Sequence, residues 1–266
     1  MPLTRFQQQL LADLAPGQPE DMGYLAGGAA LHFTPESTRF SRDLDFFHDS
    51  VERVAAAFTR DRQRLESSGY ALEVLLSQPG FVRAVVSRAD ESTRIDWAHD
   101  SAWRFMPLVR DSLGGLLLHP VDLAVNKLLA LVGRDEPRDF VDMLFIHERI
   151  LPVGALCWAA VGKDPGLTPL SLLELLQRQG RYQPGDFARL DLREPFDFVA
   201  GRKLWRTALA EADAFCQGRP PDESGCLFWS PKEQRFLMPA HGAQVVPHFG
   251  RPGGVLPMMG AGGSGR

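Results

Sequence analysis

The sequence predicts an α+β protein in which a mixed helix–strand half is followed by a helical half. In the first half, β-branched or aromatic runs at residues 70–76, 81–87 and 93–97 are bounded by turn residues, which is typical of strands. From Pro120 onward, apolar residues recur at helical spacing up to about residue 216. A chain of 266 residues is long enough to bury a substantial core.

The first half is predicted to hold a sheet of roughly four or five strands with flanking helices. Thr4 can cap the first helix, and Gly69 can end a long later one. Residues 43–47 alternate between acidic and apolar side chains, which indicates a strand with one polar face. The expected order is helix 4–14, a break at Gly17-Gln18-Pro19, apolar run 22–26, a brief helix after Gly27-Gly28, polar turn 34–41, strand 43–47, helix 50–67 and the three later strands.

We expect three segments: a core domain at residues 1–115, a helical domain at residues 116–218 and a Gly/Pro-rich C-terminal tail at residues 219–266. The tail contains a possible hairpin that pairs 226–229 with 235–237, and Gly253-Gly254 and residues 260–266 look disordered or weakly held. The expected helices of the second half are 120–132, 137–149, 153–161, 169–179 and 194–216.

Composition argues against three classes: strongly basic nucleic-acid-binding proteins, disulfide-stabilised proteins and membrane-spanning proteins. The net charge of −4 argues against a chain coated with positive charge for nucleic acid, although a local basic patch stays open. The three cysteines have no metal-ligand spacing and indicate reduced thiols in a cytoplasmic protein. The most apolar stretch, residues 113–132, contains Asp122, Asn126 and Lys127, which excludes a membrane span.

Asp43 and Asp45 are the first candidate site. At positions i and i+2 of a strand, both side chains emerge on one face, and a divalent cation relieves the repulsion between them. Their oxygen ligands suit Mg²⁺ or Mn²⁺. Alternating aspartates on a strand are often only a solvated face, but Gly27-Gly28 lies upstream at a strand-to-helix turn, where bare backbone amides can approach a phosphate.

A third carboxylate would complete a site for two cations. Asp96 ends a different predicted strand and is the best candidate, with Asp100 as the fallback. The alternative role for Asp96 is a side chain that caps the turn after the strand, and by itself its position favours neither role.

Charged residues also gather on the predicted helices of the second half. Lys127 borders an apolar helix face, where a lysine usually extends its charge to water but can instead reach a phosphate. Asp139 and Asp142 share a helix face at spacing i, i+3, and Arg138 could pair with Asp142 at spacing i, i+4. Structural salt bridging is the simplest role for these charges, and it is the role favoured for Arg138.

These motifs together resemble the AbiEii/AbiGii-type nucleotidyltransferase family, toxins of bacterial type IV toxin–antitoxin systems. The resemblance covers roughly residues 20–150. Its first part is Gly27-Gly28-Ala29-Ala30-Leu31 followed by Arg39-Phe-Ser41-Arg-Asp43-Leu-Asp45-Phe46-Phe47. Its second part is Lys127-Leu-Leu-Ala130, Arg134 and Arg138-Asp139-Phe-Val-Asp142.

The resemblance implies a polymerase-β-like nucleotidyltransferase core with a mixed sheet, and a helical domain that completes the active-site cleft. It implies Mg²⁺-dependent transfer of a nucleoside monophosphate from an NTP, in some relatives to the 3′ end of tRNA, and a possible antitoxin partner. Carried over by residue, Gly27, Gly28 and Ser41 would contact phosphate, and Asp43 and Asp45 would bind metal. Lys127 would bind the triphosphate beside the catalytic carboxylate Asp139, and Asp96 would join the metal ligands.

One residue departs from the family's pattern: Ala29 stands where such enzymes commonly have Ser or Thr.

Two alternatives to an RNA-directed enzyme stay open. The first is a nucleotidyltransferase that modifies a small molecule or a protein, which the lack of a continuous basic run favours. The second is a non-catalytic nucleotide-binding module, which Ala29 alone supports. The sequence does not reveal the NTP base, the acceptor or the oligomeric state.

Overall fold

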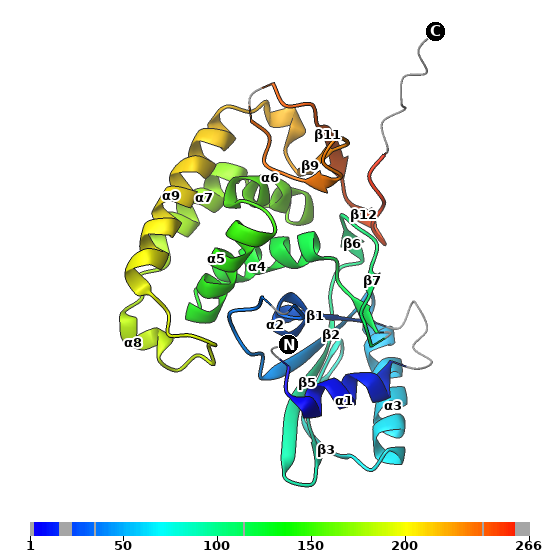
Figure 1. Cartoon of the computed structure of the whole chain (residues 1–266). Helices are drawn as coiled ribbons and strands as arrows, with labels where there is room; N and C mark the ends of the chain where they lie inside the picture. Colours follow the sequence, from blue (N-terminus) through cyan, green and yellow to red (C-terminus); the bar gives the residue numbers. More distant parts are fainter. Residues whose placement is uncertain (1–2, 16–22, 35, 114, 241, 259–266) are drawn as a thin grey trace. The chain divides into compact units, whose positions relative to one another are not determined.

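The computed structural model divides the chain into two compact units, and it describes residues 3–15, 23–34, 36–113, 115–240 and 242–258 (Figure 1). The sheet unit comprises Met1–Ala102, Pro107–His119 and Asp191–Glu194. The helical unit comprises Trp103–Met106, Pro120–Leu190 and Pro195–Arg266. The boundaries expected at residues 115 and 218 stay predictions. The helix break at residues 17–19 and the weakly held end at residues 260–266 lie outside the described residues. Gly253-Gly254, expected to be weakly held, instead belong to a turn in which the Gly254 amide donates to the carbonyl oxygen of Arg251 at 2.9 Å.

A mixed sheet organises the sheet unit, which confirms the predicted α+β class. Within the described residues it has seven strands in the order β3-β4-β5-β2-β1-β8-β7. Strand β2 runs parallel to β5, whereas β1 and β2, like β4 and β5, are antiparallel. The elements of this unit are α1 (Arg5–Leu14), β1 (Tyr24–Ala26), α2 (Gly27–Leu31), β2 (Asp43–His48), α3 (Val51–Ser67), β3 (Ala71–Gln78), β4 (Phe81–Arg88), β5 (Glu91–His99), β7 (Val109–Arg110) and β8 (Leu116–Leu117).

The two faces of this sheet differ in burial. Every second side chain of β2 and β4 is buried. The buried face includes Leu44 and Trp97 and packs against α3, where Asp61 accepts a hydrogen bond from Nε1 of Trp97 at 2.9 Å. The opposite face of β2 is half-buried and carries Asp43 and Asp45. Alternation along β2 therefore separates the core from the candidate site.

Helix α1 forms a hydrogen bond with the loop that precedes β2. Thr4 caps it as predicted, in a capping box with Gln7. The buried Gln7 side chain also donates from Nε2 to the carbonyl oxygen of Ser41 and to Oγ1 of Thr93, both at 3.1 Å. A helix that sequence analysis predicts from periodicity thus also fixes the position of a predicted site residue.

The helical unit contains the helices expected from Pro120 onward. Helix α9 begins at Phe198 rather than near residue 194, because Asp197 caps it after Pro195. The elements are β6 (Trp103–Arg104), α4 (Pro120–Arg134), α5 (Pro137–Arg149), α6 (Val153–Lys163), α7 (Pro169–Arg178), α8 (Pro184–Phe187), α9 (Phe198–Gln217), the 3₁₀ helix η1 (Pro221–Glu223), β9 (Cys226–Ser230), β10 (Arg235–Phe236), β11 (Val246–Phe249) and β12 (Arg251–Pro252).

The predicted hairpin near the C-terminus is present, and more strands join it than expected. Phe236 of β10 pairs with Trp229 of β9. Strand β11 pairs with the other edge of β9, and β12 pairs with β6. Sequence patterns do not predict two-residue strands such as β6, β7 and β12, because they offer no alternation to detect.

Helix α6 forms the most buried part of the helical unit. Cys157 and Ala159 are fully buried, and Trp158 is 3% exposed. Burial raises the pKa of the Cys157 thiol well above its ordinary value. Within the described residues, no single helix has the length and apolar character needed to cross a membrane, and the pair α5–α6 meets that criterion only jointly, with a bend of 111° between them.

Candidate functional site

The turn between β1 and α2 places two glycines against polar side chains of the sheet unit. Gly27 has a φ of 61°, a left-handed conformation that favours glycine. A Cβ atom at Gly27 would lie 1.9 Å from Oδ2 of Asp45. A Cβ atom at Gly28 would lie 2.8 Å from Nη2 of Arg39 and 3.3 Å from Oγ of Ser41. The missing side chains therefore let the backbone approach a carboxylate, a guanidinium and a hydroxyl group.

Ser41 and Arg39 belong to the loop that leads into β2. Ser41 is 6% exposed, and its hydroxyl donates to the carbonyl oxygen of Asp43 at 3.0 Å. Arg39 is 8% exposed and donates from Nη1 to the carbonyl oxygen of Phe40 at 3.1 Å. A buried arginine beside Gly28 adds positive charge to the turn, a role that the sequence pattern alone does not indicate.

Residues Asp191–Glu194, which we call the strap, hold the same loop from a distant part of the sequence. The amide of Phe40 donates to the carbonyl oxygen of Asp191 at 2.8 Å. The amide of Arg193 donates to the carbonyl oxygen of Thr38 at 3.0 Å. The strap is a further part of the candidate site that sequence analysis missed, because nothing local in residues 191–194 indicates this pairing.

Three carboxylates lie on the half-buried face of the sheet. Asp43 and Asp45 share that face because they are two residues apart on β2. Asp96 of the parallel strand β5 is the direct partner of Asp45, so these side chains emerge next to each other. The structure thus brings Asp96 to the predicted pair, and we call Asp43, Asp45 and Asp96 the carboxylate row.

Two arginines that sequence analysis did not select lie within this row. Arg83 of β4 binds Asp96 through two hydrogen bonds, Nε to Oδ1 at 2.8 Å and Nη2 to Oδ2 at 2.6 Å. Arg94 of β5 donates from Nη2 to Oδ2 of Asp43, and its Nε lies 3.9 Å from Oδ1 of Asp96. The available sequence signal was weak: Arg83 interrupts the apolar residues of β4, and Arg94 lies two residues before Asp96.

A second cluster of charges lies in the helical unit. Lys127 of α4 places Nζ 3.2 Å from Oδ1 of Asp139 and 2.7 Å from Oδ2 of Asp142. Arg134 donates to both oxygens of Asp139, at 2.6 and 2.8 Å. Asp139 and Asp142 are fully buried, and Lys127 is 6% exposed, so its charge does not extend to water. Burial by itself raises the pKa of Asp139, but the Arg134 hydrogen bond and the Lys127 charge lower it below its ordinary value.

The predicted site residues therefore form two groups. Gly27, Gly28 and Ser41 lie with the carboxylate row in the sheet unit, whereas Lys127 and Asp139 contact each other in the helical unit. Each group is assembled within its own unit. The expectation that both groups face one cleft stays a prediction.

The carboxylate row has the donor chemistry that a divalent cation requires. Carboxylate oxygens are hard ligands that suit Mg²⁺ and Mn²⁺. The glycine at position 27 leaves the Asp45 carboxylate in direct contact with the turn. Within the described ranges, no three His, Cys, Asp or Glu side chains are grouped to hold a metal ion by themselves. Because Mg²⁺ usually binds one or two carboxylates together with substrate phosphates, phosphate oxygens would complete its ligand shell.

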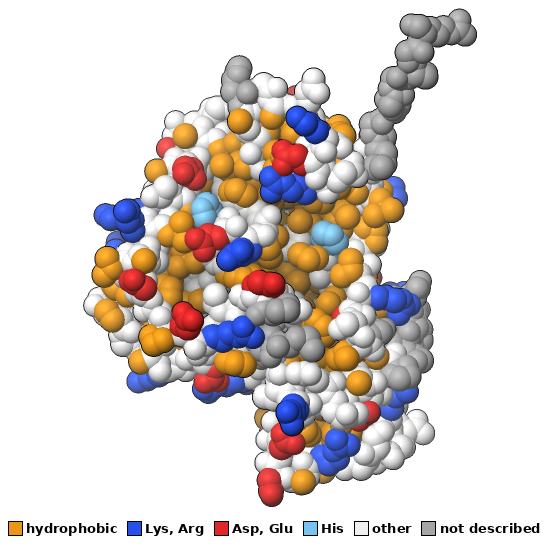
Figure 2. All heavy atoms as spheres, in the orientation of Figure 1, with side chains coloured by type: hydrophobic (Ala, Val, Ile, Leu, Met, Phe, Trp, Pro, Cys, Tyr) orange, Lys and Arg blue, Asp and Glu red, His pale blue; other side chains and the backbone are white. Residues whose placement is uncertain are grey.

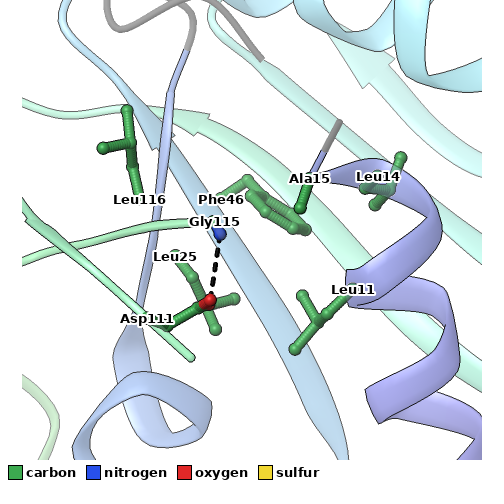
Figure 3. A pocket seen from close by; sticks show the side chains of 8 residues that line it. All are labelled: Leu11, Leu14, Ala15, Leu25, Phe46, Asp111, Gly115 and Leu116. Atoms are coloured by element: carbon green, nitrogen blue, oxygen red, sulfur yellow. Dashed lines mark hydrogen bonds between the residues drawn. The ribbon is translucent and has the colours of Figure 1, made fainter. Parts of the chain in front are cut away.

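A small pocket, drawn in Figure 3, lies elsewhere in the sheet unit. Its lining is mostly apolar, and its polar feature is the hydrogen bond from the Gly115 amide to Oδ1 of Asp111 at 2.9 Å. It contains none of the predicted site residues. It is lined by Leu11, Leu14, Ala15, Leu25, Phe46, Asp111, Gly115 and Leu116.

The sequence and the fold were compared with known proteins. Among solved structures, MenT4, the nucleotidyltransferase toxin Rv2826c from Mycobacterium tuberculosis H37Rv, matches with a TM-score of 0.55 and 17% identity, over 82% of this chain and 83% of that one. A candidate nucleotidyltransferase from H. pylori matches with a TM-score of 0.51 and 17% identity, over 80% and 94% of the respective chains. At these identities the likeness concerns the fold alone. No curated protein matches the chain by sequence.

A family profile gives the more specific result. The profile described as nucleotidyl transferase AbiEii toxin of a type IV toxin–antitoxin system matches residues 9–217. The match includes both groups of predicted site residues and most of the chain. The protein therefore belongs to the AbiEii family of nucleotidyltransferase toxins.

Proposed function

We propose that this chain transfers a nucleoside monophosphate from an NTP to the 3′ end of a tRNA, releases pyrophosphate, and acts as the toxin of a toxin–antitoxin pair. The observation that supports this most directly is the position of Asp45, against the Gly27 turn and beside Asp96. A turn with bare amides suits phosphate, and neighbouring carboxylates suit the cation that accompanies an NTP.

Each group in the sheet unit has a role in this proposal. The amides of Gly27 and Gly28 and the hydroxyl of Ser41 contact the phosphates, and the carboxylate row holds Mg²⁺ or Mn²⁺. The bound cation stabilises negative charge on the phosphoryl oxygens. A carboxylate oxygen of the row accepts the proton of the acceptor hydroxyl, whose oxygen bonds to the α-phosphorus as the bond to pyrophosphate breaks.

The helical unit contributes Lys127 and Asp139 to the proposed function. Lys127 is assigned to the triphosphate, with Asp139 as the catalytic carboxylate beside it. The contacts of Lys127 with two buried carboxylates support this role, because they fix the ammonium group in one position. A fixed donor needs no reorganisation when charge develops on the leaving group.

The acceptor is the least constrained part of the proposal. Figure 2 shows basic and acidic side chains interspersed on the face drawn. The net charge of −4 and the lack of a continuous basic run in the sequence favour the second candidate function, in which the enzyme modifies a small molecule or a protein. Ala29, which supports a non-catalytic module, is fully buried, so its side chain packs in the interior of the sheet unit. The missing hydroxyl is therefore weak support for an inactive protein.

A labelling assay tests the proposed activity. Purified protein is incubated with Mg²⁺, each α-labelled NTP in turn, and total tRNA, and both tRNA label and released pyrophosphate are measured. Asp45→Asn and Gly27→Ala are expected to lower labelling by about 10²-fold or more, because each disturbs electrostatic stabilisation at the phosphate. Gly69→Ala is the matched control for Gly27→Ala: its φ is also positive, at 81°, but a Cβ there meets nothing within 4 Å.

The outcomes separate the candidate functions. Labelled tRNA that disappears in Asp45→Asn supports the proposal, and equal labelling by this variant removes the site assignment. Pyrophosphate release with a protein or a small molecule, but not with tRNA, supports the second function. NTP binding by calorimetry without turnover on any acceptor supports a non-catalytic module.

Two further features belong to the proposal. Membership of a type IV family suggests an antitoxin partner, and NTP consumption suggests action in the cytoplasm. Expression of the chain in a bacterial host is expected to stop growth, whereas Asp45→Asn is expected to be harmless at equal protein level. An antitoxin encoded by a neighbouring gene would restore growth when co-expressed.

A further inference from the structure

Arg83 and Arg94 hold their carboxylates in different ways. Arg83 uses Nε and Nη2 together on Asp96, and this hydrogen bonding raises the pKa of Arg83. Arg94 contacts Asp43 through Nη2, while its Nε is buried without a hydrogen-bond partner in the part of the chain that the structure describes. The first arrangement satisfies the geometry of a guanidinium and a carboxylate, and the second satisfies only part of it.

The two ion pairs also differ in the solvent exposure of their carboxylates. The side chains of Arg94 and Arg83 are similarly exposed, at 37% and 35%, but that of Asp43 is 22% exposed and that of Asp96 only 9%. Asp43 is more accessible to water, and one nitrogen atom of Arg94 holds it where two nitrogen atoms of Arg83 hold Asp96, so breaking the Arg94–Asp43 pair costs less. The three carboxylates and two guanidiniums carry one net negative charge, so a divalent cation that enters this row meets competition from positive charges already present.

We propose that Arg94 is a displaceable counter-ion that couples cation binding to nucleotide binding. Before the nucleotide binds, Arg94 neutralises Asp43. When the nucleotide and its cation bind, Asp43 turns to the cation and the guanidinium of Arg94 donates to a phosphate oxygen instead. Arg83 stays on Asp96 throughout as a fixed counter-ion, and the remaining lone pairs of the Asp96 carboxylate stay available to the cation. This inference rests on the proposed function, because it requires a cation at Asp43 and Asp45.

The exchange has a consequence that a merely structural arginine would not have. A free divalent cation must displace Arg94 from Asp43 and leaves it without an anionic partner. A cation that arrives with a nucleotide supplies phosphate oxygens as the new partner. Arg94 therefore weakens the binding of the free cation and strengthens the binding of the cation–nucleotide complex, which makes the site selective for the complex.

Direct binding measurements on the full chain test this exchange. Free Mn²⁺ is followed by electron paramagnetic resonance during titration, first alone and then with a non-hydrolysable NTP analogue. In R94Q, Mn²⁺ alone is expected to bind about fivefold to tenfold tighter, and the Mn²⁺–analogue complex about tenfold weaker, than in the wild type. R94K keeps the charge and is expected to lie close to the wild type in both titrations. R88Q is the matched control, because Arg88 of the same sheet lies over the Tyr70 ring at 4.2 Å, away from the row.

Each outcome bears on either the inference or the proposed function. Opposite shifts of the two affinities in R94Q, with R88Q unchanged, support the exchange. Unchanged or weaker binding of free Mn²⁺ in R94Q overturns the exchange, and so does an R94K variant that behaves like R94Q. In either case the proposed function stands if Asp45→Asn still abolishes Mn²⁺ binding. If neither the wild type nor R94Q binds Mn²⁺, with or without the analogue, the cation site of the proposed function is wrong and the exchange falls with it.

Discussion

The buried charged side chains of the helical unit form ion pairs with one another. Desolvation of an ion costs several kcal/mol, so Lys127, Asp139 and Asp142 persist in the interior through their mutual contacts and through Arg134. The pKa of Asp139 is lowered in the folded protein. A lowered pKa means that the stabilisation is present above the pKa of the unfolded chain and is lost as the pH falls.

Asp122, at the start of α4, titrates in the opposite sense. Burial raises its pKa from 3.8 to about 6, although its carboxylate accepts hydrogen bonds from the amides of Phe105 and Met106 at 2.7 and 3.0 Å. The charges of Lys163 and Arg104 offset only part of this effect. Because the folded pKa exceeds the unfolded one, protonation favours the folded state.

We predict that the contribution of Asp122 to stability is greatest below pH 4 and falls as the pH rises to about 6. A shift from 3.8 to about 6 corresponds to about 3 kcal/mol. Chemical denaturation of the wild type and Asp122→Asn between pH 4 and pH 7 measures it. The variant is expected to gain stability relative to the wild type as the pH rises. Parallel pH profiles for the two proteins would show that Asp122 does not titrate in this range.

Among the elements, the loop before β2 depends on partners far away in the chain. Gln7 of α1 binds the carbonyl oxygen of Ser41, and the strap pairs with the backbone on the other part of the loop. Arg42 and Asp191 add an ion pair between the loop and the strap, which lowers the pKa of Asp191. The loop that presents Ser41 is thus ordered by elements that do not belong to the motif.

The strap is expected to position this loop for nucleotide binding. Arg193→Pro removes the amide that donates to Thr38, and a lost hydrogen bond of about 1 kcal/mol raises the KM for the NTP about fivefold. Arg193→Ala is the comparison variant, since it removes the side chain and keeps the amide; its KM is expected to rise less than that of Arg193→Pro. Steady-state kinetics of pyrophosphate release measures both. Equal KM values in Arg193→Pro and Arg193→Ala would contradict a positioning role for the strap.

For the molecule as a whole, the described residues that follow the family match, up to Met258, belong to the helical unit. The match ends at residue 217, and the C-terminal strands begin at Cys226. Trp158 of α6 donates from Nε1 to the carbonyl oxygen of Glu223 at 2.8 Å, and its own carbonyl accepts from the Gly225 amide at 2.9 Å. The predicted Gly/Pro-rich tail therefore contributes to the core, at least through β9.

This packing predicts a large stability difference between two phenylalanines of the C-terminal strands. Phe228 of β9 is 1% exposed and contacts the Phe215 ring, whereas Phe249 of β11 is 51% exposed. Phe228→Ala is expected to destabilise the protein by about 3–5 kcal/mol. Phe249→Ala is expected to change stability by less than about 1 kcal/mol. Thermal denaturation of both variants checks this, and similar melting temperatures would show that β9 is not part of a cooperative core.

Sequence alone predicted the features that depend on neighbouring residues. The turn at Gly27-Gly28 and the shared face of Asp43 and Asp45 follow from local chain geometry, and the helices from Pro120 onward follow from periodicity. The family resemblance further predicted that Asp139 lies beside Lys127, and the two side chains are in contact.

The tertiary structure decided which distant residues meet. Arg83 and Arg94 join the carboxylate row because β4, β5 and β2 pair in one particular register, and a shift of one residue would move them to the other face. The strap meets its loop across roughly 150 residues of sequence, a pairing that no local pattern specifies. Register and long-range pairing arise from the balance of packing over the whole sheet, so these partners of the predicted site could be identified only from the fold.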